Sequence, residues 1–307
     1  MATVRKMRIK IKWKNLIAAL VFLILLTFGI TELIVCIVKV VNPPKKVKEK
    51  PVVAKKINTN KEIKLNKLDN IDKEINFFNI DYLDRYVSYK EEHSEMPNKQ
   101  IIKDVNMNLD KEYYKHTIPA RNLNTEKVLV NKYYYLEKDY VPNNLETIST
   151  RFALSNMKMV KEAKNAFEEM ANAAKKEGLN IVAMSCYRSY DYQVNLYNKY
   201  VKTDGKETAD TYSGRPGHSE HQTGLAVDVY NQKENYTNFE KTKEFTWMDK
   251  HAHEYGFILR FPKDKERETG YTYESWHYRY VGTEIAKYIK EHDISFEEYY
   301  ATIIKDW

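Results

Sequence analysis

Two short polar motifs, far apart in the chain, constrain it more than any other feature. The first is Ser219-Glu220-His221-Gln222-Thr223-Gly224-Leu225-Ala226-Val227-Asp228, and the second is Glu274-Ser275-Trp276-His277. Together they offer two imidazoles and an aspartate as metal ligands, with Glu274 as a further carboxylate three residues before the second histidine. Such a donor set leaves one position for water and is typical of zinc-dependent hydrolysis. Both motifs are therefore expected to fold onto one site.

The residues around the first motif predict a short buried strand. Apolar residues alternate with small or polar ones along 225–230, as expected for a strand, and Gly224 leaves room where backbone passes close to a site. His221 would lie at the entry of this strand and Asp228 near its end, so one rigid element would supply two ligands. Two isolated histidines are more often ordinary surface or core residues, and the surrounding pattern is what favours a metal site.

The second motif requires a departure from regular strand geometry. Side chains alternate along a strand, so Glu274 and His277 would point to opposite faces of an ideal one. A bulge or a loop entry is needed to bring both to one metal. Irregular backbone is therefore predicted between these two residues.

The arrangement S-x-H-x-x-G-x-A-x-D followed by E-x-W-H resembles the VanY-type D-alanyl-D-alanine carboxypeptidases, which group with lysostaphin and hedgehog-like domains as LAS zinc peptidases. The resemblance covers roughly 128–292. It includes four further segments, which are Leu129–Lys132, Asp139–Pro142, Tyr187–Ser189 and Tyr255–Pro262. This family implies a metal-dependent peptidase that acts on the peptide stems of bacterial cell wall.

Carried over residue by residue, the resemblance makes His221, Asp228 and His277 the Zn²⁺ ligands. It makes Glu274 the group that takes a proton from the attacking water and passes it to the leaving amine. All three ligands and the proton-accepting carboxylate that the chemistry needs are present. A catalytically inactive wall-binding module, as among hedgehog-like relatives, is therefore the least favoured reading.

Three further residues match positions that hold the substrate's peptide end in similar proteins: Arg188, Gln193 and Ser219. A carboxypeptidase must recognise a free terminal carboxylate, which a guanidinium binds through two parallel hydrogen bonds. Arg188 is therefore expected to bind that carboxylate. The ordinary structural alternatives are a surface ion pair for Arg188, a helix face for Gln193 and a turn hydroxyl for Ser219.

The chain departs from the common family pattern at Cys186, Phe261 and Ser275, where a glycine, a tyrosine and a proline are frequent. None of these changes removes a ligand, but Phe261 lacks a hydroxyl that could bind substrate. The expected reaction is removal of the terminal D-Ala from peptidoglycan stem peptides. An L,D-carboxypeptidase acting on tetrapeptide stems and a peptidoglycan endopeptidase remain open alternatives.

The amino-terminal part predicts a membrane anchor. Residues 1–15 are basic and expected to be cytoplasmic, and 16–41 are almost wholly apolar, interrupted only by Glu32 and Lys39. Spanning a bilayer takes about 20 apolar residues, so 16–41 is expected to form a single transmembrane signal anchor. The presumed substrate then places the catalytic domain outside the cell.

The rest of the chain divides by composition. Residues 42–70 are lysine-rich and predict a flexible tether, 71–125 a small helical element, and 126–307 the zinc carboxypeptidase domain. The net charge of +7 comes largely from lysines near the predicted membrane and favours an anionic surface over nucleic acid, for which no motif is present. The two cysteines provide no internal disulfide framework. Nothing in this pattern indicates an oligomeric state.

Helical and strand patterns are mixed within 126–307. Helices are predicted over 155–176, 190–200, 247–254 and 283–291 and from Ser295, and strands over 179–184, 225–230 and 257–261 and at His277. Ligands on strands between helices favour an α+β class with an antiparallel sheet and flanking helices.

Overall fold

The computed structural model describes residues 66, 68 and 75–306. All of them belong to one compact unit, Glu62–Trp307. The predicted basic segment 1–15, the predicted span 16–41 and nearly all of the predicted tether 42–70 lie outside the described residues. Among the helices that the structure does describe, none has the length and apolar character needed to cross a bilayer.

The described chain forms helices and short strands. The α-helices are α3 (Leu83–Glu92), α4 (Asn98–Asn106), α5 (Lys161–Lys176), α6 (Tyr190–Asp204), α7 (Lys206–Tyr212), α8 (Lys243–His251), α9 (Glu266–Thr269), α10 (Thr283–His292) and α11 (Phe296–Tyr299). The strands are β1 (Ile118–Pro119), β2 (Tyr134–Tyr135), β3 (Leu145–Thr147), β4 (Lys158–Val160), β5 (Val182–Ser185), β6 (Ala226–Tyr230), β7 (Phe257–Leu259) and β8 (His277–Tyr280). Short 3-10 turns are η2 (Ile80–Tyr82), η3 (Glu220–Thr223), η4 (Tyr236–Lys241) and η5 (Ala252–Tyr255), and a π-turn, η6, spans Tyr300–Ile304.

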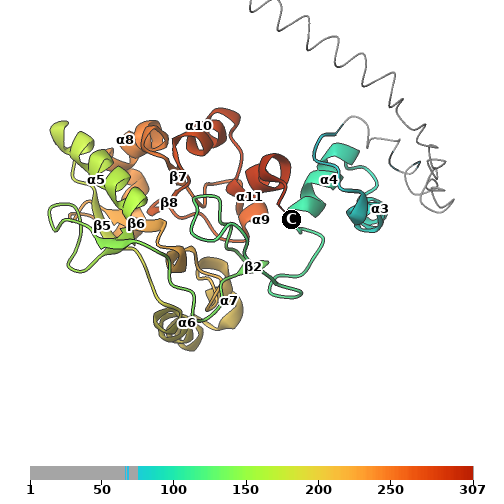
Figure 1. The fold of residues 1–307 in the computed structure, drawn as a ribbon, viewed down its shortest axis with the longest axis horizontal. Helices are drawn as coiled ribbons and strands as arrows, with labels where there is room; N and C mark the ends of the chain where they lie inside the picture. Colours follow the sequence, from blue (N-terminus) through green and yellow to red (C-terminus); the bar gives the residue numbers. More distant parts are fainter. Residues whose placement is uncertain (1–65, 67, 69–74, 307) are drawn as a thin grey trace, which may run out of the picture. The chain divides into compact units, whose positions relative to one another are not determined.

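A four-stranded antiparallel sheet, in the order β5-β6-β8-β7, forms the centre of residues 126–307. In Figure 1, α5, α8 and α10 lie on one side of this sheet and α6 and α7 on the other. Val227 and Val229 of β6 join the main apolar core, in which Phe167 of α5 meets Phe257 of β7. Because side chains alternate along a strand, Asp228 faces away from that core. The predicted mixed α+β class is confirmed.

The predicted helix 155–176 begins later than expected. α5 starts only at Lys161, because Lys158–Val160 form β4 and pair with β3. Met159 is buried in the main core from this strand. Over a stretch as short as 155–160, the apolar pattern of a strand cannot be distinguished from that of a helix. The predicted start of the helix was therefore wrong.

His221 also differs from expectation, since it lies in the 3-10 turn η3 and not on the strand. Gly224 ends this turn with φ +69°, a conformation that favours glycine. A Cβ at Gly224 would come within 2.9 Å of Leu145 Cδ2 and 3.1 Å of Val160 Cγ2, so the glycine also permits close packing against β3 and β4. The turn η3, and not strand β6, therefore positions the His221 side chain.

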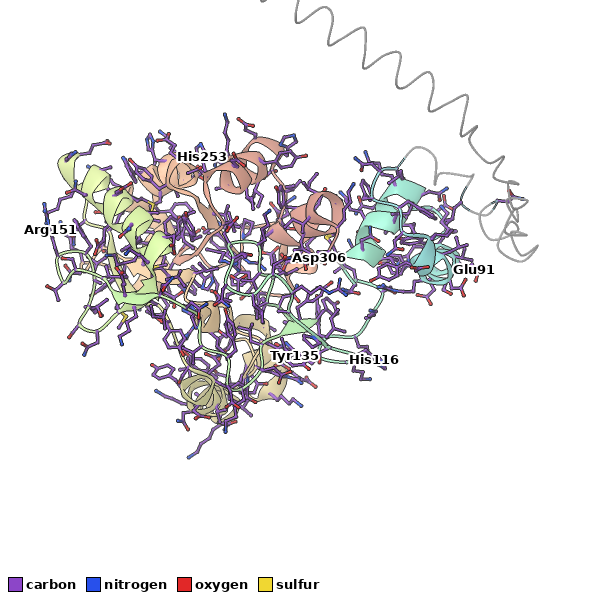
Figure 2. The ribbon with its side chains drawn as sticks, viewed as in Figure 1. Glu91, His116, Tyr135, Arg151, His253 and Asp306 are labelled. Carbon is purple, nitrogen blue, oxygen red and sulfur yellow. The ribbon has the colours of Figure 1, made fainter. Side chains whose placement is uncertain are left out.

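The helices α3 and α4 have a small apolar core of their own, formed with residues that include Tyr86 and Ile101. Two ion pairs join α4 to later segments of the chain: Lys103 Nζ lies 2.9 Å from Glu298 Oε1, and Arg267 Nη2 lies 2.5 Å from Asp104 Oδ2. The segment after these helices contacts the carboxyl-terminal part of the chain. The carboxylate of Asp306, labelled in Figure 2, accepts hydrogen bonds from the side chains of Arg121 and Asn122 at 3.0 and 2.7 Å.

Candidate metal centre and active site

The register of the central sheet brings two predicted ligands together. Asp228 on β6 and His277 on β8 are direct cross-strand partners. His221 reaches the same place from η3, where its carbonyl accepts a hydrogen bond from the backbone N–H of Arg188 at 3.1 Å. One ligand atom from each of the three residues lies within 4.8 Å of the others, and all three side chains are buried. The predicted ligand set is thus assembled in space.

His221 presents one particular nitrogen to this cluster. Its Nδ1 lies 2.6 Å from the carbonyl oxygen of Cys186, so Nδ1 carries the proton and donates it. Its Nε2 lies 3.3 Å from Asp228 Oδ2 and has no hydrogen-bond partner within the described part of the chain. Burial and the nearby Arg188 charge lower the pKa of His221 to about 4. The imidazole is therefore neutral, as a metal ligand must be.

His277 faces the cluster through Nδ1, whereas His221 does so through Nε2. Nδ1 lies 2.9 Å from Asp228 Oδ1, while Nε2 points the opposite way, 3.6 Å from Glu220 Oε2. Burial alone would lower the pKa of His277, but the Asp228 and Glu220 carboxylates outweigh it and raise the pKa to about 9. Without metal, His277 is an imidazolium, and it must give up its Nδ1 proton before it can bind one.

Glu274 stands beside the cluster on irregular backbone. Strand β8 begins only at His277, whose N–H reaches back to the carbonyl oxygen of Glu274 at 3.4 Å, so the prediction of a non-strand connection is confirmed. Glu274 Oε2 lies 3.9 Å from His277 Nδ1. Burial raises the pKa of Glu274 to about 8. A carboxyl group that titrates near neutrality is suited to take and return a proton.

The three predicted substrate residues line one cavity with the ligands. This cavity has a volume of about 590 Å³, and Arg188, Gln193 and Ser219 all border it. Arg188 Nε and Gln193 Oε1 are buried without hydrogen-bond partners among the described residues. The amide nitrogen of Gln193 is already held by the carbonyl of Gly214 at 2.7 Å. One donor and one acceptor are therefore left for a polar ligand.

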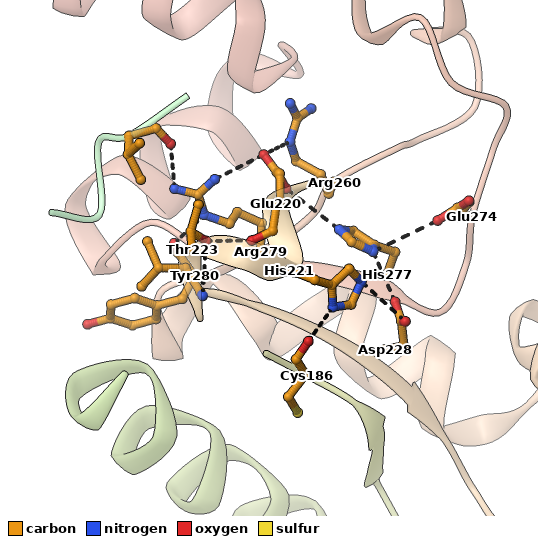
Figure 3. Close-up of polar contacts among 12 residues, drawn as sticks. Cys186, Glu220, His221, Thr223, Asp228, Arg260, Glu274, His277, Arg279 and Tyr280 are labelled. Carbon is orange, nitrogen blue, oxygen red and sulfur yellow. Dashed lines mark hydrogen bonds and ion pairs between the residues drawn. The ribbon is translucent and has the colours of Figure 1, made fainter. Parts of the chain in front are cut away.

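Three charged residues behind the site were given no role by the sequence motifs. Figure 3 shows Glu220 between Arg260 and Arg279, on the side of His277 away from Asp228. Glu220 Oε1 accepts hydrogen bonds from Arg260 Nε at 2.8 Å and from Arg279 Nη1 at 2.9 Å. All three side chains are almost fully buried. The available signal was an arginine within each of two apolar or aromatic segments, at Arg260 and Arg279, whereas Glu220 lies among polar residues and gave no such signal.

Comparison with known proteins gives the family. Residues 156–283 match the model of the VanY family, D-alanyl-D-alanine carboxypeptidase. A putative carboxypeptidase of Bacillus subtilis, YodJ, is 40% identical over 184 residues, which cover 58% of this chain and 67% of that protein. The chain belongs to the VanY family. The predicted family resemblance is confirmed.

Solved structures of VanY-family and related enzymes agree with this assignment. The LD-carboxypeptidase LdcB is 38% identical with a TM-score of 0.58, over 63% of this chain and 93% of that one. A mutant of the vancomycin resistance D,D-pentapeptidase VanY, in complex with Zn(II), is 30% identical with a TM-score of 0.50, over 57% and 98%. Since identity exceeds 25% in both, the likeness extends beyond the fold.

The VanY-family site carries a pH dependence that can be tested on the metal-free protein. The pKa values of His277 and Glu274 are both raised, to about 9 and about 8. Raised values mean that the folded state binds more protons than the unfolded state. The stabilisation that these two groups contribute is therefore present at low pH and is lost as the pH rises through their pKa values in the folded state. The free energy of unfolding falls by at most about 1.4 kcal/mol per pH unit for each group.

We expect urea midpoints of the chelated protein to fall between pH 6.5 and 9. His221 titrates below this window, because its pKa is lowered to about 4. A His277→Gln variant should show a shallower fall, because only the Glu274 contribution remains. A wild-type midpoint that stays constant or rises across this window would contradict the assigned protonation states.

Proposed function

We propose that this chain is a zinc-dependent D,D-carboxypeptidase that removes the terminal D-Ala from peptidoglycan stem peptides. The observation that supports this proposal most directly is the buried cluster of His221, Asp228 and His277. This cluster lines the same cavity as Arg188 and Glu274. Two nitrogens and one carboxylate oxygen with an open position form the donor set of catalytic zinc sites. Nε2 of His221, which has no hydrogen-bond partner among the residues that the structure describes, fits a role as a ligand.

The residues of the site then have defined roles. Bound Zn²⁺ supplies a Lewis acid that polarises a peptide carbonyl and makes water more acidic. Glu274 takes the proton of the attacking water and returns it to the amine that leaves. Arg188 orients the substrate by its terminal carboxylate, and the buried surroundings exclude bulk water, which strengthens each of these charge interactions.

An L,D-carboxypeptidase that acts on tetrapeptide stems is the second candidate. The observation in its favour is the greater similarity to the LD-carboxypeptidase LdcB, at 38% identity and TM-score 0.58, than to the D,D-pentapeptidase VanY, at 30% and 0.50. Both candidates use the same metal cluster and the same base. They differ in the residue accommodated on the amino side of the cleaved bond.

Purified stem peptides decide between the two. The protein from residue 71 onward is incubated with pentapeptide and with tetrapeptide, with and without chelator, and the products are weighed by mass spectrometry. We expect loss of one alanine from the pentapeptide, abolished by chelator and restored by zinc. Loss of alanine from the tetrapeptide alone would favour the L,D activity, and activity that survives complete metal removal would refute the zinc mechanism.

We further propose that residues 16–41 anchor the enzyme in the cell membrane with its catalytic domain outside. Support comes from the length and apolar character of this run and from a substrate that belongs to the cell wall. Fractionation of cells that express the full chain, followed by protease treatment of intact spheroplasts, tests both parts. A full chain found in the soluble fraction, or protected from the protease, would contradict the proposal.

A further inference from the structure

We infer that Glu220 is a positioning residue for the metal centre: its carboxylate holds His277 with Nδ1 turned toward the metal and Nε2 turned away. This inference rests on the proposed zinc site. It concerns a residue that neither binds the metal nor reaches the reacting atoms. The test is therefore metal binding and not turnover.

Glu220 Oε2 and His277 Nε2 face each other. Glu220 Oε2 and His277 Nε2 are both buried, and neither has a hydrogen bond within the residues that the structure describes. They lie 3.6 Å apart, slightly beyond hydrogen-bonding distance. A buried donor and a buried acceptor that are both unpaired are costly, and a small approach of these two satisfies both. A carboxylate behind a metal-binding histidine orients the ring and raises its basicity.

The other oxygen of Glu220 is held rigidly. Oε1 accepts from both Arg260 and Arg279, at 2.8 and 2.9 Å. Arg260 continues to Glu297 on α11 through bonds of 2.8 and 2.5 Å, and Arg279 donates to the carbonyl oxygen of Val128 at 2.7 Å. The carboxylate therefore has little freedom to turn away from His277. Arg260 and Arg279, which come from different segments of the chain, together fix its position.

The buried cluster around Glu220 is balanced in charge. Two arginines face two carboxylates, so the cluster is neutral as a whole, and every member is paired. Removing one partner from such a buried network leaves an uncompensated charge. Glu297 shares the network but is not among the groups paired with His277. A substitution there perturbs the cluster without touching the histidine, which makes it a matched control.

The experiment measures metal affinity in Glu220→Gln, Glu220→Asp and Glu297→Gln. Zinc dissociation constants come from competition with a chromophoric chelator, and the visible absorption of the Co²⁺-substituted protein reports ligand geometry. Loss of an outer partner of a metal-binding histidine typically weakens affinity about 10- to 100-fold, and we expect this range for Glu220→Gln, with an altered cobalt spectrum. Glu297→Gln should bind zinc and cobalt as the wild type does.

Glu220→Asp keeps the charge for both arginines but draws the carboxylate back from His277. It should therefore fold, bind zinc more weakly than wild type, and decide the matter if either glutamine variant fails to fold. Wild-type affinity in the folded Glu220 variants, or equal weakening in Glu297→Gln, would overturn the inference. A wild-type protein that binds neither zinc nor cobalt would instead refute the proposed metal site itself.

Discussion

Glu274→Gln is expected to bind zinc with wild-type affinity and to lose nearly all turnover. The amide keeps the size and the buried position of the side chain but has no proton-accepting carboxylate. Removing a general acid–base group typically costs about 10²- to 10⁴-fold, and a residue that serves both attack and departure should lie at the upper end. Single-turnover rates on the pentapeptide, beside zinc content per folded protein, measure the two effects separately.

Protonation of Glu274 links its role to the metal. Burial raises the pKa of Glu274 to about 8 in the metal-free site, and the positive charge of a bound metal would lower it, which favours the carboxylate that takes the proton of the attacking water. Glu220→Gln is the matched comparison, since it removes a second buried carboxylate from the same site and should act on metal affinity instead. A Glu274→Gln variant with wild-type turnover would assign the base to another residue.

Arg188→Ala should reduce kcat/KM on free stem peptides by roughly ten- to a hundredfold, with little effect on folding. A charge-assisted hydrogen bond contributes about 1.5 to 3 kcal/mol, and the guanidinium fork matches the terminal carboxylate. The buried Nε of Arg188 has no partner among the described side chains, so its removal should leave no group of the protein unpaired. Thermal melting of both proteins checks that the fold is retained.

Amidation of the stem carboxyl terminus is the corresponding change on the substrate. The wild type should cleave the amidated stem far more slowly than the free stem, and Arg188→Ala should lose most of that preference. Arg188→Lys keeps the charge but not the fork and should fall between the two. Equal wild-type rates on free and amidated stems would contradict the carboxypeptidase reading and favour an endopeptidase.

The chemistry of the site could be predicted from the sequence because it depends on residue types at specific spacings. His221, Asp228, His277 and Glu274 carry functional groups that few structural roles require together, and the alternation along 225–230 indicated a strand for Asp228. The need for irregular backbone before His277 followed from side-chain alternation alone. Local geometry was sufficient for the strand and for the irregular backbone, whereas the individual roles of the ligands and of Glu274 followed from the family resemblance.

The tertiary structure alone decided how these residues meet and what holds them. The pairing of β6 with β8 sets Asp228 opposite His277, and no local pattern specifies the register of strands so distant in sequence. The same is true of Glu220, whose partners Arg260 and Arg279 come from other segments. A sequence reports which groups a chain can offer, whereas the partner of a buried charge depends on long-range packing, because only folding removes the water that would otherwise solvate it.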